Sequence, residues 1–381
     1  MIGCVLIRYY RPALTALVAL VVTSACGANM ASQSIDMVTQ GARAGLTRPV
    51  DTTSVLKKLR KNVVIGSTVD SGNGDKGPRA ISIVTVEKVL GKGDLLVCNF
   101  ENSAGSAGSG TTIEILKAAP GSLPTRFVQD GAIEGCDADA IDDDNTVFAG
   151  GLTSGELVKL SDTAKTLETY QGSPIKAPFY DAYAVPQQPF SPQYIFIGTT
   201  AGGIVSISTG PYGDGIATQV ADGFAVNMGT GWSLLAPSGL QYDAEIDTLY
   251  IADGVTNTIV AFSHASELLE QDEITVKPSG KTFKCKQPKV TCARLVYSGA
   301  PLDGPLASAL LPDGNLIVAN TRGTANTLVE LTPAGQILDT KVIDKSATQG
   351  VFGLAAIGTD DANTALYFTD ANDNNVHKLE R

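Results

Sequence analysis

Ionisable side chains occupy alternate positions in two short segments of the chain. Asp137 is followed two residues later by Asp139, and Asp181 is followed in the same way by Tyr183. Because successive side chains of a β-strand point to opposite faces, each pair lies on one face if its segment is a strand. Carboxylate oxygens are hard ligands of the kind that Ca²⁺ prefers. We therefore predict Asp137, Asp139 and Asp181 as candidate ligands of one divalent cation, with Ca²⁺ as the best match.

Other chemistry has less support in the sequence. The chain contains two histidines, His264 and His377, and neither lies in a local catalytic motif. Residues 72–77 spell G-x-G-x-x-G, but that motif binds phosphate only between a strand and a helix, and here Pro78 and the strand-like residues 81–84 follow it. The sequence therefore leaves open whether the protein is an enzyme; if it is, a metal that polarises a carbonyl group would supply the chemistry.

Six repeated segments must position these residues. Each has four or five mainly apolar residues and ends in a small residue, Asn or Asp, and a polar turn and a second short strand follow. The copies, which recur at intervals of 48 to 67 residues, are residues 95–99, 146–150, 194–198, 249–253, 316–320 and 366–370. A period of roughly 50 residues built only from strands and turns is typical of β-propeller blades. We predict an all-β fold, a six-bladed β-propeller of four-stranded antiparallel blades, over residues 59–381.

The two ends of this region predict how the ring closes. The chain stops at Arg381, about two strands after the last repeat begins, so the last blade lacks its outer strand. Residues 61–68 form a strand-like segment ahead of the first repeat. Propellers commonly close by completing one blade with strands from both ends of the chain, so we expect residues 61–68 to supply the missing strand.

Inner strands of such a ring line a central channel, and the candidate residues are expected at its mouth. We assign six residues to this mouth: Arg79, Asp137, Asp139, Asp181, Tyr183 and Trp232. An alternative for the charged residues is a purely structural role. In that case they form a solvated or salt-bridged lining of the channel, with Arg79 as the counter-charge. Trp232, the single tryptophan, would either stack against a sugar at the mouth or fill the core between blades.

The first residues have the pattern of an export signal. Arg8 and Arg11 precede the apolar run 13–22, and small residues then lead to Cys26. This pattern resembles the lipobox of bacterial lipoproteins, although Thr23 stands where that family prefers Leu. The resemblance implies that residues 1–25 are a signal peptide and that Cys26 is lipidated; the alternative is ordinary cleavage that releases a soluble protein.

Residues 26–58 are predicted to be a flexible tether because they contain few large apolar side chains. We expect the exported protein in the cell envelope, anchored to a membrane by lipid or otherwise periplasmic or secreted. The only membrane contact expected is this N-terminal lipid anchor.

Four cysteines remain beyond the export segment, namely Cys98, Cys136, Cys285 and Cys292. An even number in an exported chain suggests disulfides. Cys285 and Cys292 lie close enough in sequence to link one loop, which leaves Cys98 to pair with Cys136 on the neighbouring blade. The alternative is four buried, unpaired thiols.

Residues 236–381 resemble the NHL repeat. The residues that carry the resemblance are 237–243, 248–254 and 257–262, and the fifth and sixth copies are similar. The resemblance implies a six-bladed propeller used mainly for binding, with metal-dependent lactonases of the gluconolactonase type as relatives. Those lactonases hold their metal at the axial mouth with carboxylates and an Asn, and their Glu and Asn positions have no match here.

The overall charge narrows the range of partners. Acidic residues outnumber basic ones 39 to 28, giving a net charge of −11, whereas nucleic-acid binding needs basic surfaces. We therefore expect a monomer that binds an envelope protein, a peptide or a glycan without catalysis. The alternative is a metal-dependent, lactonase-like hydrolase with its site at the channel mouth.

Overall fold

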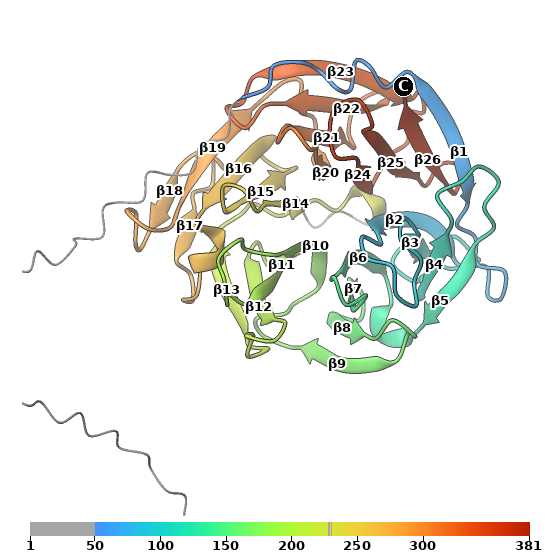
Figure 1. Ribbon diagram of the computed structural model, residues 1–381, viewed down its shortest axis with the longest axis horizontal. Helices are drawn as coiled ribbons and strands as arrows, with labels where there is room; N and C mark the ends of the chain where they lie inside the picture. Colours follow the sequence, from blue (N-terminus) through green and yellow to red (C-terminus); the bar gives the residue numbers. More distant parts are fainter. Residues whose placement is uncertain (1–49, 228, 230) are drawn as a thin grey trace, which may run out of the picture. The chain divides into compact units, whose positions relative to one another are not determined.

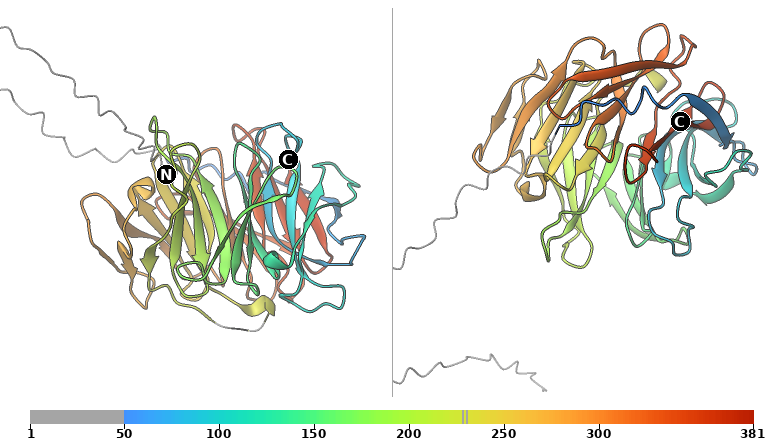
Figure 2. Two further views of the ribbon diagram at one scale, coloured as in Figure 1. Left: turned by 90° about the horizontal axis from the view of Figure 1, so that it is seen from below. Right: turned by 45° about the horizontal axis from the view of Figure 1, so that its top comes forward.

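The computed structural model describes residues 50–227, 229 and 231–381. Their strands form six sheets around a central axis (Figure 1). Each sheet contains four antiparallel strands that follow one another from the axis to the rim, and the third sheet has two further strands. Figure 2 shows the same blades from the side. The predicted six-bladed β-propeller is confirmed.

In each blade the innermost strand is followed along the chain by the next two strands outward. The first blade consists of β2 (Lys76–Ile83), β3 (Leu95–Glu101), β4 (Thr112–Leu116) and β5 (Thr125–Gln129). The second consists of β6 (Cys136–Ile141), β7 (Val147–Gly151), β8 (Glu156–Leu160) and β9 (Thr166–Gln171). The third consists of β10 (Pro178–Ala184), β11 (Gln193–Thr199), β12 (Ile204–Thr209) and β13 (Ala217–Asp222).

The fourth blade consists of β14 (Pro237–Asp243), β15 (Thr248–Asp253), β16 (Thr258–Ser263) and β19 (Cys292–Ser298). The fifth consists of β20 (Pro305–Leu310), β21 (Leu316–Asn320), β22 (Asn326–Leu331) and β23 (Ile337–Asp344). The sixth consists of β24 (Leu354–Ile357), β25 (Ala365–Asp370), β26 (Asn375–Glu380) and β1 (Lys61–Ser67). Short 3₁₀ helices are η1 (Gly131–Ile133), η2 (Gly231–Ser233) and η3 (Ala265–Glu267).

The six repeated segments are the second strands of the six blades. β7, β15 and β25 are buried along their whole length, because the neighbouring blades cover both faces of each. This explains their nearly continuous apolar sequences, since a strand buried on both faces has no polar side to alternate with. Burial falls toward the rim, where β9 is mostly exposed.

Ring closure follows the prediction. β1 pairs antiparallel with β26, with Lys61 opposite Glu380 and Val64 opposite His377. Figure 1 shows β1 (blue) along the outer edge of β26 (dark red). The strand from the start of the described chain therefore completes the blade made by its end.

The segment just before β1 differs from the predicted tether. Val55 and Leu56 are fully buried, and the Ser54 hydroxyl and both of their backbone N–H groups donate hydrogen bonds of 2.6 to 2.9 Å to the Glu330 carboxylate on β22. A short apolar pair and one buried acceptor thus hold residues 54–59 to the fifth blade, and the predicted tether of residues 26–58 is too long at this end. The predicted signal peptide, Cys26 and the rest of the tether lie outside the described residues.

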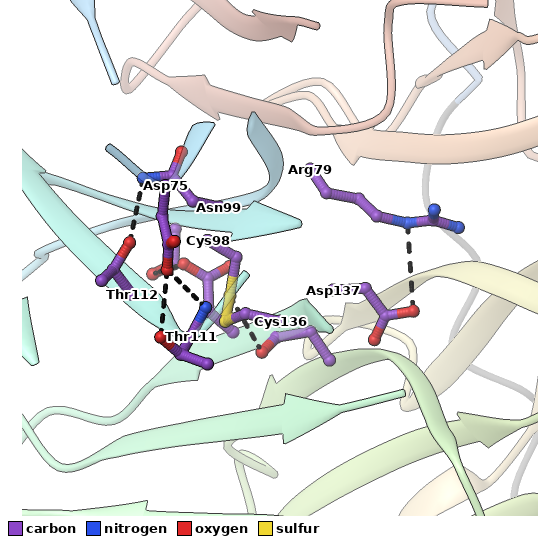
Figure 3. Close-up of a disulfide and its surroundings, with 11 residues drawn as sticks. Asp75, Arg79, Cys98, Asn99, Thr111, Thr112, Cys136 and Asp137 are labelled. Carbon is purple, nitrogen blue, oxygen red and sulfur yellow. Dashed lines mark hydrogen bonds and ion pairs between the residues drawn. A yellow bond between two sulfur atoms is a disulfide. The ribbon is translucent and has the colours of Figure 1, made fainter. Parts of the chain in front are cut away.

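Two disulfides are present, as predicted. Cys98 on β3 is bonded to Cys136 on β6 and so joins the first two blades (Figure 3). Cys285 is bonded to Cys292 within the insertion of the fourth blade. The two bonds indicate an oxidising, exported environment. Among the helices of the described residues, none has the length and apolar character needed to cross a membrane.

The insertion between β16 and β19 contributes to the neighbouring blade. β17 (Ile274–Val276) pairs in parallel with β13 and antiparallel with β18 (Phe283–Cys285), so two short strands extend the third blade. The insertion also contains the single turn of η3.

The buried carboxyl group of Glu114 on β4 predicts a pH dependence of stability. Glu114 is 1% exposed, and burial, followed by the nearby Asp70, raises its pKa to about 9. The folded protein therefore keeps a proton that the unfolded chain loses at its ordinary pKa, so stability falls as pH rises through this window. We expect Glu114→Gln to flatten this decline, as measured by urea unfolding at about pH 5 and about pH 8. Equal pH dependence in both proteins would assign the effect to other groups.

Candidate functional site

Bulges in the inner strands determine the direction in which some of the candidate side chains point. The pairing of β2 with β3 shifts between Pro78 and Ile81, and that of β6 with β7 shifts between Cys136 and Ala138. Similar shifts occur in β10, β14 and β20. A bulge re-aims the side chains that it contains, and Arg79 and Asp137, which lie in the first two bulges, point toward one another (Figure 3). Strict alternation along these strands therefore fails at Asp137.

Aromatic rings enclose Arg79 at one end of the channel. Its guanidinium carbon lies 4.3 Å from the ring centre of Phe100, 5.1 Å from Phe179, 5.2 Å from Phe352 and 5.6 Å from Trp232. Arg79 is fully buried. A cation over the faces of aromatic rings is stabilised by their quadrupoles, most strongly when it is desolvated.

Trp232 packs against other aromatic rings, as expected if it fills the core between blades and not if it is free to stack on a sugar. Its ring stacks on Phe352 with centroids 4.5 Å apart and lies 4.8 Å from the ring centre of Phe100. Its indole N–H donates a 2.7 Å hydrogen bond to Glu101. The rings and the polar edge of the indole are thus engaged within the protein.

Asp137 is the counter-charge of Arg79. The Nε atom of Arg79 lies 3.9 Å from Oδ2 of Asp137, and both side chains are fully buried. Burial raises the pKa of Asp137, and the Arg79 charge opposes that shift. Within the described residues no hydrogen bond reaches either carboxylate oxygen of Asp137 or the guanidinium nitrogens of Arg79. The pair thus lies among the aromatic rings that enclose Arg79.

Asp139, Asp181 and Tyr183 lie together, apart from Arg79 and Asp137. They line an open cavity of about 290 Å³, which we call the mouth, and Asp139 and Asp181 also line a narrower space of about 50 Å³. Asp139 is 6% exposed, and Ser82 donates a 3.3 Å hydrogen bond to its Oδ2. Oδ1 of Asp139, Oδ2 of Asp181 and the Tyr183 hydroxyl have no hydrogen-bond partner among the described residues.

Electrostatics in the mouth favour neutralisation of these carboxylates. Burial raises the pKa of Asp139 well above its ordinary value, and the charge of Asp181 adds to the shift. Burial also raises the pKa of Asp181, with Asp137 as the second cause. The mouth therefore favours a proton or another positive group next to the two carboxylates.

Gln241 in the mouth and Ser308 in the narrower space are both hydrogen-bonded within the protein. Gln241 donates a 2.9 Å hydrogen bond to the Ser308 carbonyl and accepts one from the Leu310 N–H. The Ser308 hydroxyl donates to the Gly239 carbonyl at 2.5 Å. These bonds join β14 to β20, whereas Asp139, Asp181 and the Tyr183 hydroxyl keep free hydrogen-bonding capacity.

The structure thus divides the six candidate residues into two groups. Arg79, Asp137 and Trp232 lie together in the aromatic enclosure, and Asp139, Asp181 and Tyr183 lie at the mouth. Sequence reasoning did not identify the aromatic enclosure, whose members are Phe100, Phe179 and Phe352. The one sequence feature that could have indicated this enclosure is the position of Phe179, two residues before the candidate residue Asp181.

The predicted three-carboxylate metal site fits the geometry only in part. Sets of three potential ligands with their atoms within 4.8 Å of one another occur elsewhere in the described residues, and none includes a channel carboxylate; they are Asp247–His264–Glu267, Asp370–Asp373–His377 and Asp51–Asp313–Asp361. Because Asp137 faces Arg79, Asp139 and Asp181 are the two carboxylates that a cation in the mouth would reach. Any such ion would be held by these two and by water.

Both histidines lie outside the channel lining. His377 bonds Asp373 through Nε2 and Asn62 through Nδ1, and its ring stacks on Phe368. His264 precedes η3 in the insertion. The mouth lining contains no histidine, lysine or arginine among the described residues.

No family model and no curated protein matches this sequence. Solved structures share its fold. A gluconolactonase from Xanthomonas campestris is 12% identical, with 87% of this chain and 95% of that chain covered and a TM-score of 0.55. A protein assigned provisionally as a gluconolactonase is 10% identical, with 84% and 91% covered and a TM-score of 0.52. Virginiamycin B lyase from Staphylococcus aureus is 14% identical, with 84% and 85% covered and a TM-score of 0.49. The chain is therefore a six-bladed propeller with the fold that gluconolactonases have, and its function must be argued from its own site.

Proposed function

We propose that this chain is an exported, non-catalytic binding propeller whose ligand enters the mouth. The observation that carries the proposal is the pair of Asp139 and Asp181, which present buried carboxylate oxygens without partners to an open cavity. Leaving such acceptors unpaired is costly, so a ligand that supplies donors or positive charge is stabilised there. Within the described residues, the mouth lining holds no basic or imidazole side chain to serve as a general base or nucleophile activator.

A predicted lipid anchor at Cys26 would hold such a propeller at a membrane of the cell envelope. The disulfides support export, and the anchor is part of the proposal. Mass spectrometry of the mature N-terminus tests it, because an unmodified N-terminus downstream of Cys26 would exclude lipidation.

The second candidate function is metal-dependent hydrolysis of a lactone. It draws on the same carboxylates and on the fold shared with gluconolactonases. An ion at Asp139 and Asp181 would polarise a substrate carbonyl and lower the pKa of bound water. The pairing of the third predicted ligand, Asp137, with Arg79 favours the binding function over this one.

Comparison of the wild-type protein with Asp139→Asn separates the two functions. For a binding propeller we expect no metal in stoichiometric amount after purification without chelator, and no lactone hydrolysis that depends on Asp139. Elemental analysis and a lactone panel with added Ca²⁺ measure both. One equivalent of metal and lactonase activity, both lost in Asp139→Asn, would establish the hydrolase.

A positive test follows the melting temperature with a panel of cationic, neutral and anionic small molecules. We expect at least one class to raise the melting temperature of the wild-type protein, and to raise that of Asp139→Asn/Asp181→Asn much less. A shift of equal size in the double variant would place binding outside the mouth.

A further inference from the structure

We infer that the ligand of the mouth presents a primary alkylammonium group, as a lysine side chain does. The inference rests on the proposed binding function and names its ligand class. In this arrangement the ammonium head lies between the carboxylates of Asp139 and Asp181, and the aliphatic stem lies between the apolar walls of the mouth.

Charge is the first observation in favour. Among the described residues, the mouth is lined by two carboxylates and by no basic side chain. The buried cation of the channel, Arg79, lies among aromatic rings and beside Asp137. Next to the mouth, the Asp143 carboxylate accepts a hydrogen bond from Thr85, which is itself a lining residue. Such a concave acidic surface concentrates cations.

Hydrogen-bonding capacity is the second observation. Oδ1 of Asp139 and Oδ2 of Asp181 are buried acceptors without partners among the described residues. An ammonium group has three donors and no acceptor, so it can satisfy both oxygens at once without leaving a polar atom of its own unpaired. The Tyr183 hydroxyl, also without a partner there, lines the same cavity, and water can accept the third bond.

The walls distinguish an alkylammonium from other donor-rich ligands. Apart from the carboxylates, the mouth is lined by Ile81, Ile141, Leu240, Leu310 and Leu354. These side chains suit a stem of methylene groups, whereas a polyol would leave hydroxyl groups against apolar surface. The narrow space at the base, about 50 Å³, suits a compact ammonium better than a planar guanidinium with its five donors.

Isothermal titration calorimetry of the purified wild-type protein tests the ligand class directly. The probes are a pentapeptide with central lysine, the same peptide with Nε-acetyl-lysine, norleucine or arginine at that position, and n-pentylamine. We expect binding of the lysine peptide or of pentylamine, and at least about tenfold weaker binding of the acetyl-lysine and norleucine peptides, because these lack the charge. Tighter binding of the peptide than of the amine identifies a displayed lysine as the source, and equal binding identifies a small free amine.

Matched variants locate the binding. Asp139→Asn/Asp181→Asn removes two negative charges with little change of shape, and we expect it to weaken lysine-peptide binding at least about tenfold. Asp143→Asn/Asp144→Asn removes the same charge from an exposed loop near the mouth and should change binding by less than about twofold if contact, not the long-range field, dominates. Melting curves check that both proteins are folded.

Three outcomes would overturn the inference. The first is no binding of the lysine peptide or pentylamine at about 10 mM, a range in which even weak association is detected. The second is equal loss of binding in the two double variants. The third is Asp139-dependent binding of a neutral ligand in place of the amines, which would keep the proposed binding function and reject only the ligand class. Asp139-dependent lactone hydrolysis would instead reject the binding function itself.

Discussion

Replacing Arg79 with methionine is expected to lower the free energy of unfolding by about 4 kcal/mol. The substitution leaves Asp137 fully buried and removes the charge that holds down its pKa. It also removes a cation that lies within 5.6 Å of four aromatic ring centres. Loss of one partner from a buried ion pair is among the most destabilising single changes, because the remaining buried carboxyl must either stay uncompensated or take up a proton. Urea unfolding of the wild-type protein and Arg79→Met measures the effect.

Two further variants show whether the cost comes from the unpaired charge. Arg79→Met combined with Asp137→Leu removes both charges, and we expect it to recover at least half of the lost stability. Lys61→Met breaks the ion pair between Lys61 and Glu380, which is 65% exposed at the lysine, and exposed pairs contribute only about 0–1 kcal/mol. If Arg79→Met and Lys61→Met had equal effects, the enclosed cation would carry no special stability.

Removal of the disulfide between the first two blades should have the next largest effect. Cys98 and Cys136 are 38 residues apart in sequence, so in the chain-entropy account their bond stabilises the fold by about 4 kcal/mol. The bond joins the second strand of one blade to the inner strand of the next, directly before Asp137. We therefore expect Cys98→Ala/Cys136→Ala to shift the urea midpoint strongly downward, as followed by circular dichroism.

The second disulfide provides the matched control. Cys285 and Cys292 are 7 residues apart, and the same account predicts about 2 kcal/mol for their bond. This bond links β18, which extends the third blade, to β19, the outermost strand of the fourth blade, and closes only a short loop. A larger loss in Cys285→Ala/Cys292→Ala than in Cys98→Ala/Cys136→Ala would contradict the loop-length argument.

Patterns local in sequence predicted the fold well. The repeated apolar segments are buried on both faces by neighbouring blades, and that environment selects apolar and β-branched residues wherever it recurs. The closing strand could be predicted because the last repeat lacks one strand and residues 61–68 offer one. Cysteine pairing was predictable because an even number of cysteines left few combinations.

The division of the channel could not be predicted from the sequence. The rings around Arg79 come from β3, β10, η2 and the residue before Gly353, and no local pattern relates positions so far apart. The bulge at Asp137 also breaks the alternation that placed Asp137 and Asp139 on one face. A single inserted residue in a strand changes the direction of side chains without changing the composition of the segment.

Two other features of the structure could not be predicted because they also depend on contacts between residues far apart in sequence. Val55 and Leu56 lie in a polar stretch and gave no apolar periodicity, yet Glu330, far along the chain, binds their backbone. β17 pairs with β13 of a neighbouring blade, not with the blade from which its loop emerges. In each case the partner is distant in sequence, which is why neighbouring residues carried no sign of it.

Ring closure by β1 and β26 also sets an order of events during synthesis. The bond between Lys61 and Glu380 spans 319 residues, so β1 has no partner strand until β26 has left the ribosome. Until then the nascent chain carries two unpaired strand edges, which are the part of a sheet most prone to pairing with other chains. Contacts this distant in sequence are also slow to form. A ribosome that stalls before β26 has emerged would therefore release nearly the whole propeller with its ring still open.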